Sequence, residues 1–176
     1  MKKSNIALIG FRATGKSNIG KGLAASLQRE FVDMDDQLTK YFGQNIQEWV
    51  QAHGWESFRE AEARLLKDLA GWKDLIVATG GGVIEREDNR AILKKHFYVV
   101  WLKACPETVH ARLLGDCEVT SANRPSLTEL PLEEEIAHLL QVRSPLYEET
   151  ADMDLATDNA SVAELIEQIL KFVRNN

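Results

Sequence analysis

Cysteine and histidine are too few and too scattered to organise a structural site in this chain. The 176 residues include two cysteines, Cys105 and Cys117, and four histidines. A disulfide-dependent domain needs cysteines at a denser spacing, and a zinc site needs Cys or His ligands in a regular pattern. We therefore expect reduced cysteines in a cytoplasmic protein, with neither a disulfide framework nor a zinc centre.

Positive charge and long apolar runs are also lacking. Acidic residues outnumber basic residues by 27 to 21, and the net charge is −6. A diffuse basic surface for nucleic acid is not expected, so bound anions must be recognised by individual Arg or Lys side chains or by helix ends. The apolar segment that follows Met1–Ser4 is too short for a signal peptide or a membrane span. The length suits one domain, 1–176, and we expect a monomer without nucleic-acid or membrane partners.

Short apolar runs alternate with segments of helical periodicity along the chain. The runs predict strands at 5–9, 31–35, 75–79, 97–102 and 154–157. Helices are predicted at 15–27, at 46–72 with a break near Gly54, at 86–94, at 106–113, from 132 past Arg143, and after Ser161, which with Glu164 forms a capping box. This alternation predicts a three-layer α/β/α fold on a parallel sheet of about five strands. Ligands of such sheets bind at the carboxyl ends of the strands.

The segment Gly10–Ser17, GFRATGKS, matches the phosphate-binding pattern G-x-x-x-x-G-K-[ST]. A predicted strand precedes it and a predicted helix follows it, as the pattern requires. The loop N–H groups and the helix N-terminus are then expected to face a β-phosphate, and Lys16 to bridge the β- and γ-phosphates. The Ser17 hydroxyl is a ligand type that Mg²⁺ prefers. The motif predicts a bound nucleoside triphosphate but leaves the reaction open.

Acids follow the second predicted strand. Asp33 and Asp35 are alternate residues of that strand, so their carboxylates are expected to share a face. Taken alone, an acidic turn with Asp35 or Asp36 as a helix N-cap explains the pair better.

Further along the chain, Arg59 and Glu62 form an i, i+3 pair on a predicted helix, a spacing that is also typical of surface ion pairs. The glycines 80–82 directly follow the third strand. Three successive glycines cost backbone entropy, so we expect them to let a ligand approach the backbone closely. Arg124 in a polar loop and Arg143 late in a helix carry guanidinium forks that suit carboxylate or phosphate.

These elements together resemble the shikimate kinases. The phosphate loop, Asp-x-Asp, Phe-Arg-x-x-Glu, Gly-Gly-Gly, Arg-Pro and Arg-x-Pro-Leu-Tyr occur here in the family's order over nearly the whole chain. Each element alone is weakly diagnostic, whereas the ordered set is fairly specific. The resemblance implies strand order 2-3-1-4-5, a mobile lid at about 112–128 and a substrate-binding helical region at about 35–62. It also implies ATP-dependent phosphorylation of the 3-hydroxyl of shikimate, in aromatic amino-acid biosynthesis, with Mg²⁺ as cofactor.

The same resemblance assigns roles to individual residues. For the shikimate, Asp35 is expected to orient or deprotonate the attacking hydroxyl, and the remaining contacts are assigned to Arg59, Glu62, Gly80, Gly81, Gly82 and Arg143. The two arginines bind the carboxylate, and Glu62 holds Arg59. For the nucleotide, the implied residues are Ala13, Thr14, Gly15, Lys16, Ser17, Asn18, Arg112 and Arg124. Arg112 lies beneath the adenine, and Arg124 closes with the lid onto the transferring phosphate. Asp33 reaches Mg²⁺ through water, and Ser17 binds it.

A few positions depart from the family's pattern. Ala13 stands where glycine is usual, which we expect the loop to tolerate with a negative φ. Val50 and Trp55 replace a Phe and a Glu near the substrate region, and Ser126 replaces a Leu in the lid. These changes affect the pocket wall and the lid rather than the charged residues. The Glu133–Glu135 run is expected to be a solvated helix face, and the tryptophans to be core residues.

Two other functions remain open. Another phosphate-loop kinase, for gluconate or a nucleoside monophosphate, would share Gly10–Ser17 but would not be expected to combine three glycines with Arg59 and Arg143. A non-catalytic nucleotide-binding module is disfavoured because Lys16, Asp35 and Arg124 are all present.

Overall fold

A computed structural model describes residues 3–115 and 130–176 of the chain. The strands are β1 (Asn5–Ile9), β2 (Glu30–Asp33), β3 (Leu75–Ala78), β4 (Phe97–Lys103) and β5 (Met153–Ala156). The helices are α1 (Lys16–Leu27), α2 (Met34–Phe42), α3 (Ile46–Leu69), α4 (Glu87–His96), α5 (Pro106–Gly115), α6 (Leu132–Thr150) and α7 (Val162–Asn175), with a short 3₁₀ helix η1 (Val83–Glu85).

The strands form one parallel sheet in the order β2-β3-β1-β4-β5, as expected. The central strand β1 is paired on both sides, with Ile6 opposite Ile76 of β3 and Tyr98 of β4. Every residue of β1 is buried, because helices cover both faces of the sheet and exclude water from the central strand.

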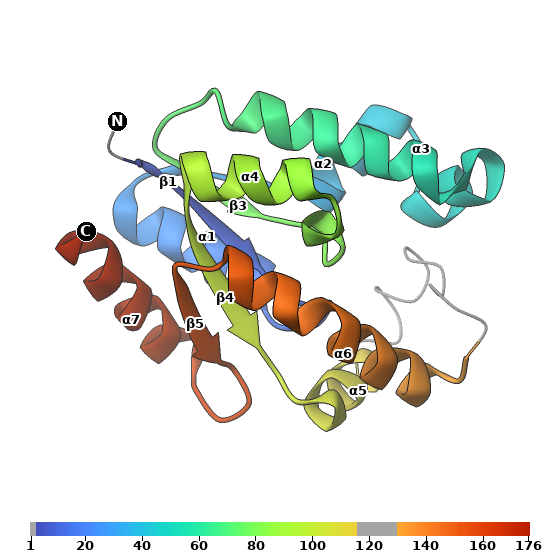
Figure 1. Ribbon diagram of the computed structural model, residues 1–176. Coiled ribbons are helices and arrows are strands. Elements are labelled where there is room, and N and C mark those ends of the chain that lie inside the picture. The colour runs from blue at the N-terminus through green and yellow to red at the C-terminus, as the bar shows by residue number, and fades with distance from the viewer. Residues whose placement is uncertain (1–2, 116–129) are drawn as a thin grey trace.

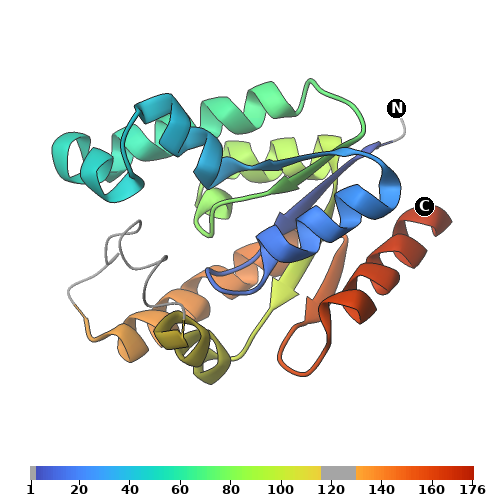
Figure 2. The same ribbon diagram turned by 180° about the vertical axis from the view of Figure 1, so that it is seen from behind.

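Each face of the sheet has its own apolar core. On one face, residues of β1, β3 and β4 pack against α3, α4 and α6; on the other, the alternate residues of the same strands pack against α1 and α7. The two views show this arrangement, with α4 and α6 in front of the sheet in Figure 1 and α1 and α7 in front in Figure 2. Because successive side chains of a strand point to opposite faces, Ala7 and Ile9 of β1 lie in the first core, and Ile6 and Leu8 lie in the second.

The helix ends follow from the local sequence. Asn45 with Glu48 and Ser161 with Glu164 form capping boxes, and the second was expected. The predicted break in the long helix is confirmed, since Gly54 has φ 80° and ψ 164° within α3. The helix from Leu132 continues past Arg143 to Thr150, also as expected.

The second strand is shorter than predicted. It ends at Asp33, and Met34 and Asp35 belong to α2 instead. Asp33 is the N-cap of that helix, because its Oδ1 accepts a hydrogen bond from the backbone N–H of Asp35 at 3.0 Å. The alternative in which Asp35 or Asp36 caps the helix is therefore wrong, and so is the expectation that strand alternation places the two acids, since Asp35 lies in α2.

Candidate active site

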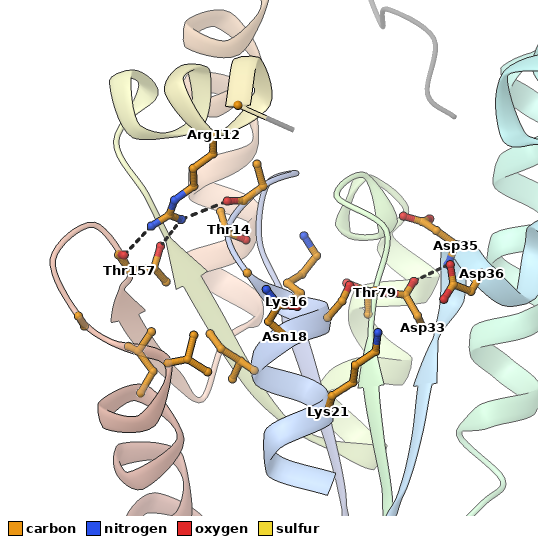
Figure 3. A pocket seen from close by; sticks show the side chains of 18 of the residues that line it. Thr14, Lys16, Asn18, Lys21, Asp33, Asp35, Asp36, Thr79, Arg112 and Thr157 are labelled. Atoms are coloured by element: carbon orange, nitrogen blue, oxygen red, sulfur yellow. Dashed lines mark hydrogen bonds between the residues drawn. The ribbon is translucent and has the colours of Figure 1, made fainter. Parts of the chain in front are cut away.

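The loop between β1 and α1 is held by hydrogen bonds to its own backbone. Thr14 Oγ1 donates to the carbonyl of Phe11 at 2.8 Å. The Lys16 ammonium is buried and donates to the carbonyls of Gly10 and Phe11 at 2.9 and 2.7 Å. Figure 3 shows Thr14 and Lys16 on this loop at the wall of a cavity. Lys16, which is predicted to bind phosphate, is thus the first residue of α1 and lies at the helix N-terminus.

Ala13 adopts a conformation that the sequence did not predict. Its φ is +61°, in the left-handed region, so the expectation of a negative φ is wrong. A Cβ atom in this region meets the following carbonyl, which is why glycine is favoured there. The Ala13 carbonyl accepts a hydrogen bond from Arg112 Nη1 at 3.1 Å, which fixes the orientation of the peptide.

Arg112 joins the phosphate loop to the loop after β5. Besides Ala13, its guanidinium donates to Thr157 Oγ1 at 3.1 Å and to the Thr157 carbonyl at 2.7 Å. Figure 3 shows these hydrogen bonds at one end of the cavity, away from the acids. Arg112 thus lies at the end of the cavity opposite the acids, and its place beneath an adenine stays a prediction.

The hydroxyl of Ser17 and the carboxylate of Asp33 meet beside the phosphate loop. Ser17 Oγ donates to Asp33 Oδ2 at 2.5 Å. The two residues come together because α1 starts at the carboxyl end of β1 and Asp33 ends β2. No cluster of three or more His, Cys, Asp or Glu side chains that could hold a metal occurs in residues 3–115 and 130–176. A cation bound here would therefore need further oxygen ligands from phosphate or water.

A cavity of about 810 Å³ runs along the phosphate loop, large enough for a nucleotide. Its lining includes residues 13–18, from the end of the loop and the first turn of α1, the three acids 33, 35 and 36, and Arg112 and Thr157 at the far end. Figure 3 places Asp33, Asp35 and Asp36 on the side of the cavity opposite Arg112. The expected nucleotide-binding residues that fall within the described part of the chain, Asn18 among them, line one continuous space.

Arg59 and Glu62 form an ion pair that is buried rather than exposed. Arg59 Nη1 donates to Glu62 Oε2 at 2.7 Å, and the Glu62 side chain is 1% exposed. Burial raises the pKa of the Glu62 carboxyl, and the charge of Arg59 opposes that rise. Glu62 Oε1 has no hydrogen-bond partner among the described residues. A buried acceptor of this kind is costly unless it receives a hydrogen bond from a ligand or water.

The glycines after β3 make room for this pair. A Cβ on Gly80 would lie 2.5 Å from Glu62 Oε1 and 3.1 Å from an oxygen of Asp35. A Cβ on Gly82 would lie 2.0 Å from Arg59 Nη2. The glycines were expected to admit a ligand to the backbone. In the structure, Gly80 and Gly82 first admit the side chains of Arg59 and Glu62.

A second, smaller cavity of about 50 Å³ lies between these side chains. The residues that line it are Arg12, Asp35, Ile46, Trp55, Phe58, Arg59, Glu62, Gly80, Gly81, Gly82 and Arg143. All the substrate-binding residues expected from the sequence are among them. Asp35 also lines the larger cavity, so it stands where the two spaces meet.

Arg143 reaches this cavity from α6, which packs on the same face of the sheet as α3, the helix that carries Arg59. Its side chain is 5% exposed and pairs with Glu85, which also contacts Arg59. The next turn of α6 is fixed by Tyr147, whose hydroxyl donates to the Gly81 carbonyl at 2.5 Å. Burial raises the pKa of that hydroxyl. Glu85 was missed from the sequence because the run Glu85–Asp88 has the composition of an exposed turn.

Arg12 and Glu135 form a buried contact that the sequence did not indicate. Arg12 Nη2 lies 2.5 Å from Glu135 Oε1, and the Glu135 side chain is 1% exposed. The expectation of a solvated Glu133–Glu135 face is therefore wrong for Glu135, because α6 turns that side chain towards the phosphate loop. The tryptophans are not core residues throughout either, since Trp72 is 51% exposed.

The positions that depart from the family's pattern near the substrate region and the lid lie in different parts of the molecule. Trp55 lines the small cavity, with its ring centroid 5.6 Å from the Arg59 guanidinium carbon. Val50 packs instead against the cluster of Leu38, Ile46 and Phe58. Arg124 and Ser126, most of the expected lid and Cys117 lie outside the described residues.

The geometry agrees with comparisons to known proteins. A protein-family model described as shikimate kinase matches residues 12–174. The chain belongs to the shikimate kinase family. A shikimate kinase of Nitratidesulfovibrio vulgaris is 40% identical over 164 residues, which cover 93% of this chain and 92% of the relative. Among solved structures, the shikimate kinase of Acinetobacter baumannii in complex with shikimate matches with a TM-score of 0.91 and 33% identity, over 99% of this chain and 95% of that one.

Shikimate kinases are not the only proteins of this shape. A gluconokinase from Sinorhizobium meliloti matches with a TM-score of 0.62 at 15% identity, which shows a shared fold alone. No helix in residues 3–115 or 130–176 is both long enough and apolar enough to cross a membrane.

Proposed function

We propose that this protein transfers the γ-phosphoryl group of ATP to the 3-hydroxyl of shikimate. The observation that carries the proposal is the position of Asp35, which lines both the nucleotide-sized cavity and the small cavity between Arg59 and Arg143. A carboxylate at that junction can contact an acceptor hydroxyl while facing the end of a bound triphosphate. Phosphoryl transfer needs chiefly such positioning, together with neutralisation of charge.

The large cavity supplies the nucleotide side of the reaction. The N-terminus of α1 and the loop N–H groups favour bound phosphate. Lys16 exchanges its contacts with the Gly10 and Phe11 carbonyls for phosphate oxygens, at little cost because both are polar acceptors. Arg112, 3.1 Å from the Ala13 carbonyl, then lies at the base end of the nucleotide. Arg124 is proposed to complete the phosphate contacts from the lid.

Ser17 and Asp33 fit a magnesium ion. Their oxygens are 2.5 Å apart beside the phosphate loop, and both are of the hard type that Mg²⁺ prefers. Ser17 would bind the ion directly, and Asp33 would hold one of its waters. When bound, Mg²⁺ neutralises charge on the phosphate oxygens.

The small cavity supplies the acceptor side. Arg59 and Arg143 present two guanidinium groups from different helices, the arrangement that suits a single carboxylate. Glu62 Oε1 and Asp35 lie beside Gly80 and can accept hydrogen bonds from ring hydroxyls. Asp35 orients the attacking hydroxyl and accepts its proton.

The rival kinases fit this site less well. Gluconate also carries a carboxylate, but it is a flexible open chain, whereas the Arg59–Glu62 pair packed against Gly80 and Gly82 offers fixed contacts that suit a rigid ring. A nucleoside monophosphate is nearly as large as the nucleotide, whereas the small cavity, about 50 Å³, is far smaller than the nucleotide-sized cavity of about 810 Å³. A regulatory nucleotide-binding module has no need for Asp35 at the junction of two cavities.

A coupled assay of ADP release with four acceptors tests the proposal. Turnover with shikimate well above that with quinate, gluconate or AMP supports it, and turnover chiefly with gluconate or AMP refutes it. The companion variant is Asp35→Asn, which should lower kcat by roughly 10²–10⁴-fold by removing the proton acceptor. Asp68→Asn makes the same charge change at an exposed position on α3, outside both cavities, and should leave kcat within a few-fold. Equal losses in both variants would remove Asp35 from the chemistry.

A further inference from the structure

Glu85 connects the two arginines of the small cavity. It is the last residue of η1 and the third residue after Gly82. Its Oε1 accepts from Arg143 Nε at 2.8 Å and lies 2.6 Å from Arg143 Nη2, while its Oε2 lies 3.4 Å from Arg59 Nε. One carboxylate therefore spans guanidinium groups that come from α3 and α6.

Glu85 contacts Arg59 and Arg143 from outside the small cavity. Arg59 and Arg143 line the small cavity, whereas Glu85 does not. Glu85 contacts the Nε atoms of both arginines, and Glu62 takes Nη1 of Arg59 at 2.7 Å. Within residues 3–115 and 130–176, no hydrogen bond or ion pair involves Arg59 Nη2 or Arg143 Nη1, so a ligand can use these two nitrogens.

We propose that Glu85 is a positioning residue, which holds Arg59 and Arg143 in the arrangement that receives the carboxylate of the acceptor substrate. This inference rests on the proposed function. Arginine side chains have many rotamers, and fixing two of them at the moment of binding would cost conformational entropy. Glu85 fixes them before the substrate arrives, which is the advantage of a preorganised site.

The charge of Glu85 acts in the opposite direction, because a carboxylate near the site repels the carboxylate of the substrate. The exposed fractions of the three side chains decide whether the loss of positioning or the relief of repulsion is larger. The Glu85 side chain is 39% exposed, so water screens its charge, whereas the Arg143 and Arg59 side chains are 5% and 16% exposed. A buried guanidinium that loses its partner must find another one, and it moves to do so. The loss of positioning is therefore expected to outweigh the relief of repulsion.

Steady-state kinetics of Glu85→Ala and Glu85→Gln test this proposal. For Glu85→Ala we expect the KM for shikimate to rise about tenfold, the size of one charge-assisted hydrogen bond, with kcat within twofold and the KM for ATP unchanged. Glu85→Gln keeps an acceptor oxygen and should show a smaller rise. The control is Glu87→Ala, which removes the same charge from an exposed position at the start of α4. A KM for shikimate that is unchanged or lower in Glu85→Ala would overturn the proposal, and so would an equal rise in Glu87→Ala.

A crystal structure of ligand-free Glu85→Ala separates this inference from the proposed function. If the wild-type protein shows no turnover with shikimate, the proposed function fails, and the structure of the variant still decides whether Glu85 positions the arginines. We expect the Arg143 guanidinium to leave its wild-type place or to lose order, with the rest of α6 unchanged. Arginines that stay where Glu85 held them would overturn the proposal.

Discussion

Replacing Ala13 by glycine should stabilise the protein, because the residue lies in the left-handed region with φ +61°. That conformation costs an L-residue about 1–2 kcal/mol relative to the right-handed region. Glycine also makes the unfolded chain more flexible, and this lowers the stability of the folded protein by about 0.4–1 kcal/mol. The net gain is about 0.5–1 kcal/mol, which for a chain of this length raises Tm by roughly 1–4 °C. The hydrogen bond from the Arg112 side chain to the residue-13 carbonyl is retained, since residue 13 contributes only its backbone to it.

Ala25→Gly is the matched control for this prediction. Ala25 is exposed within α1, so the same chemical change there removes helix propensity and should lower stability by about 1 kcal/mol. Thermal unfolding followed by circular dichroism, with urea unfolding as a second measure, compares the two variants. Opposite signs are expected. A fall in Tm for Ala13→Gly similar to that for Ala25→Gly would refute the assignment of strain to Ala13.

Three further variants test the small cavity and its support. Arg59→Lys loses the guanidinium fork, so the KM for shikimate should rise by roughly 10–100-fold with a smaller change in kcat; an unchanged KM would remove Arg59 from the carboxylate site. Glu62→Gln removes a carboxyl whose pKa is raised by burial from its ordinary 4.5, so the folded protein binds this proton more tightly than the unfolded chain does. The stability of the wild type relative to Glu62→Gln should therefore be greatest below pH 4.5 and fall as the pH rises through the raised value, and a difference that stays flat would contradict this. Tyr147→Phe leaves the Gly81 carbonyl without its donor and should cost about 1–3 kcal/mol in urea unfolding, whereas a cost near zero would show that water replaces the hydroxyl.

Most of the fold could be predicted from the sequence because its signals are local and agree with one another. The all-apolar β1 and the glycine loop after it specify a buried strand followed by a helix, and the capping box at Ser161 marks where α7 begins. The sheet order came from the resemblance rather than from any local pattern. The end of β2 was misplaced because Asp33 is compatible with both a strand end and an N-cap, and only the hydrogen bond to Asp35 decides between them.

The contacts of the site were less predictable than its members. Arg59, Glu62 and Arg143 carry family motifs, but that Glu85 joins the two arginines depends on how η1 turns after β3. Glu135 lies in an acidic run, and whether it faces water or Arg12 depends on the rotation of α6. The left-handed Ala13 violates the usual preference for glycine, so residue type pointed to the wrong φ. Long-range side-chain pairing leaves no periodic signal in a sequence.

The transfer of phosphate to one particular hydroxyl is tested most directly by the structure of the product. After incubation of the enzyme with ATP, Mg²⁺ and shikimate, two-dimensional ³¹P–¹H NMR shows which ring proton is coupled to the new phosphate ester. The proposed reaction, with Asp35 between the two cavities as proton acceptor, predicts a correlation with the proton at carbon 3. A correlation with the proton at carbon 4 or 5, or the appearance of inorganic phosphate alone, would contradict the account.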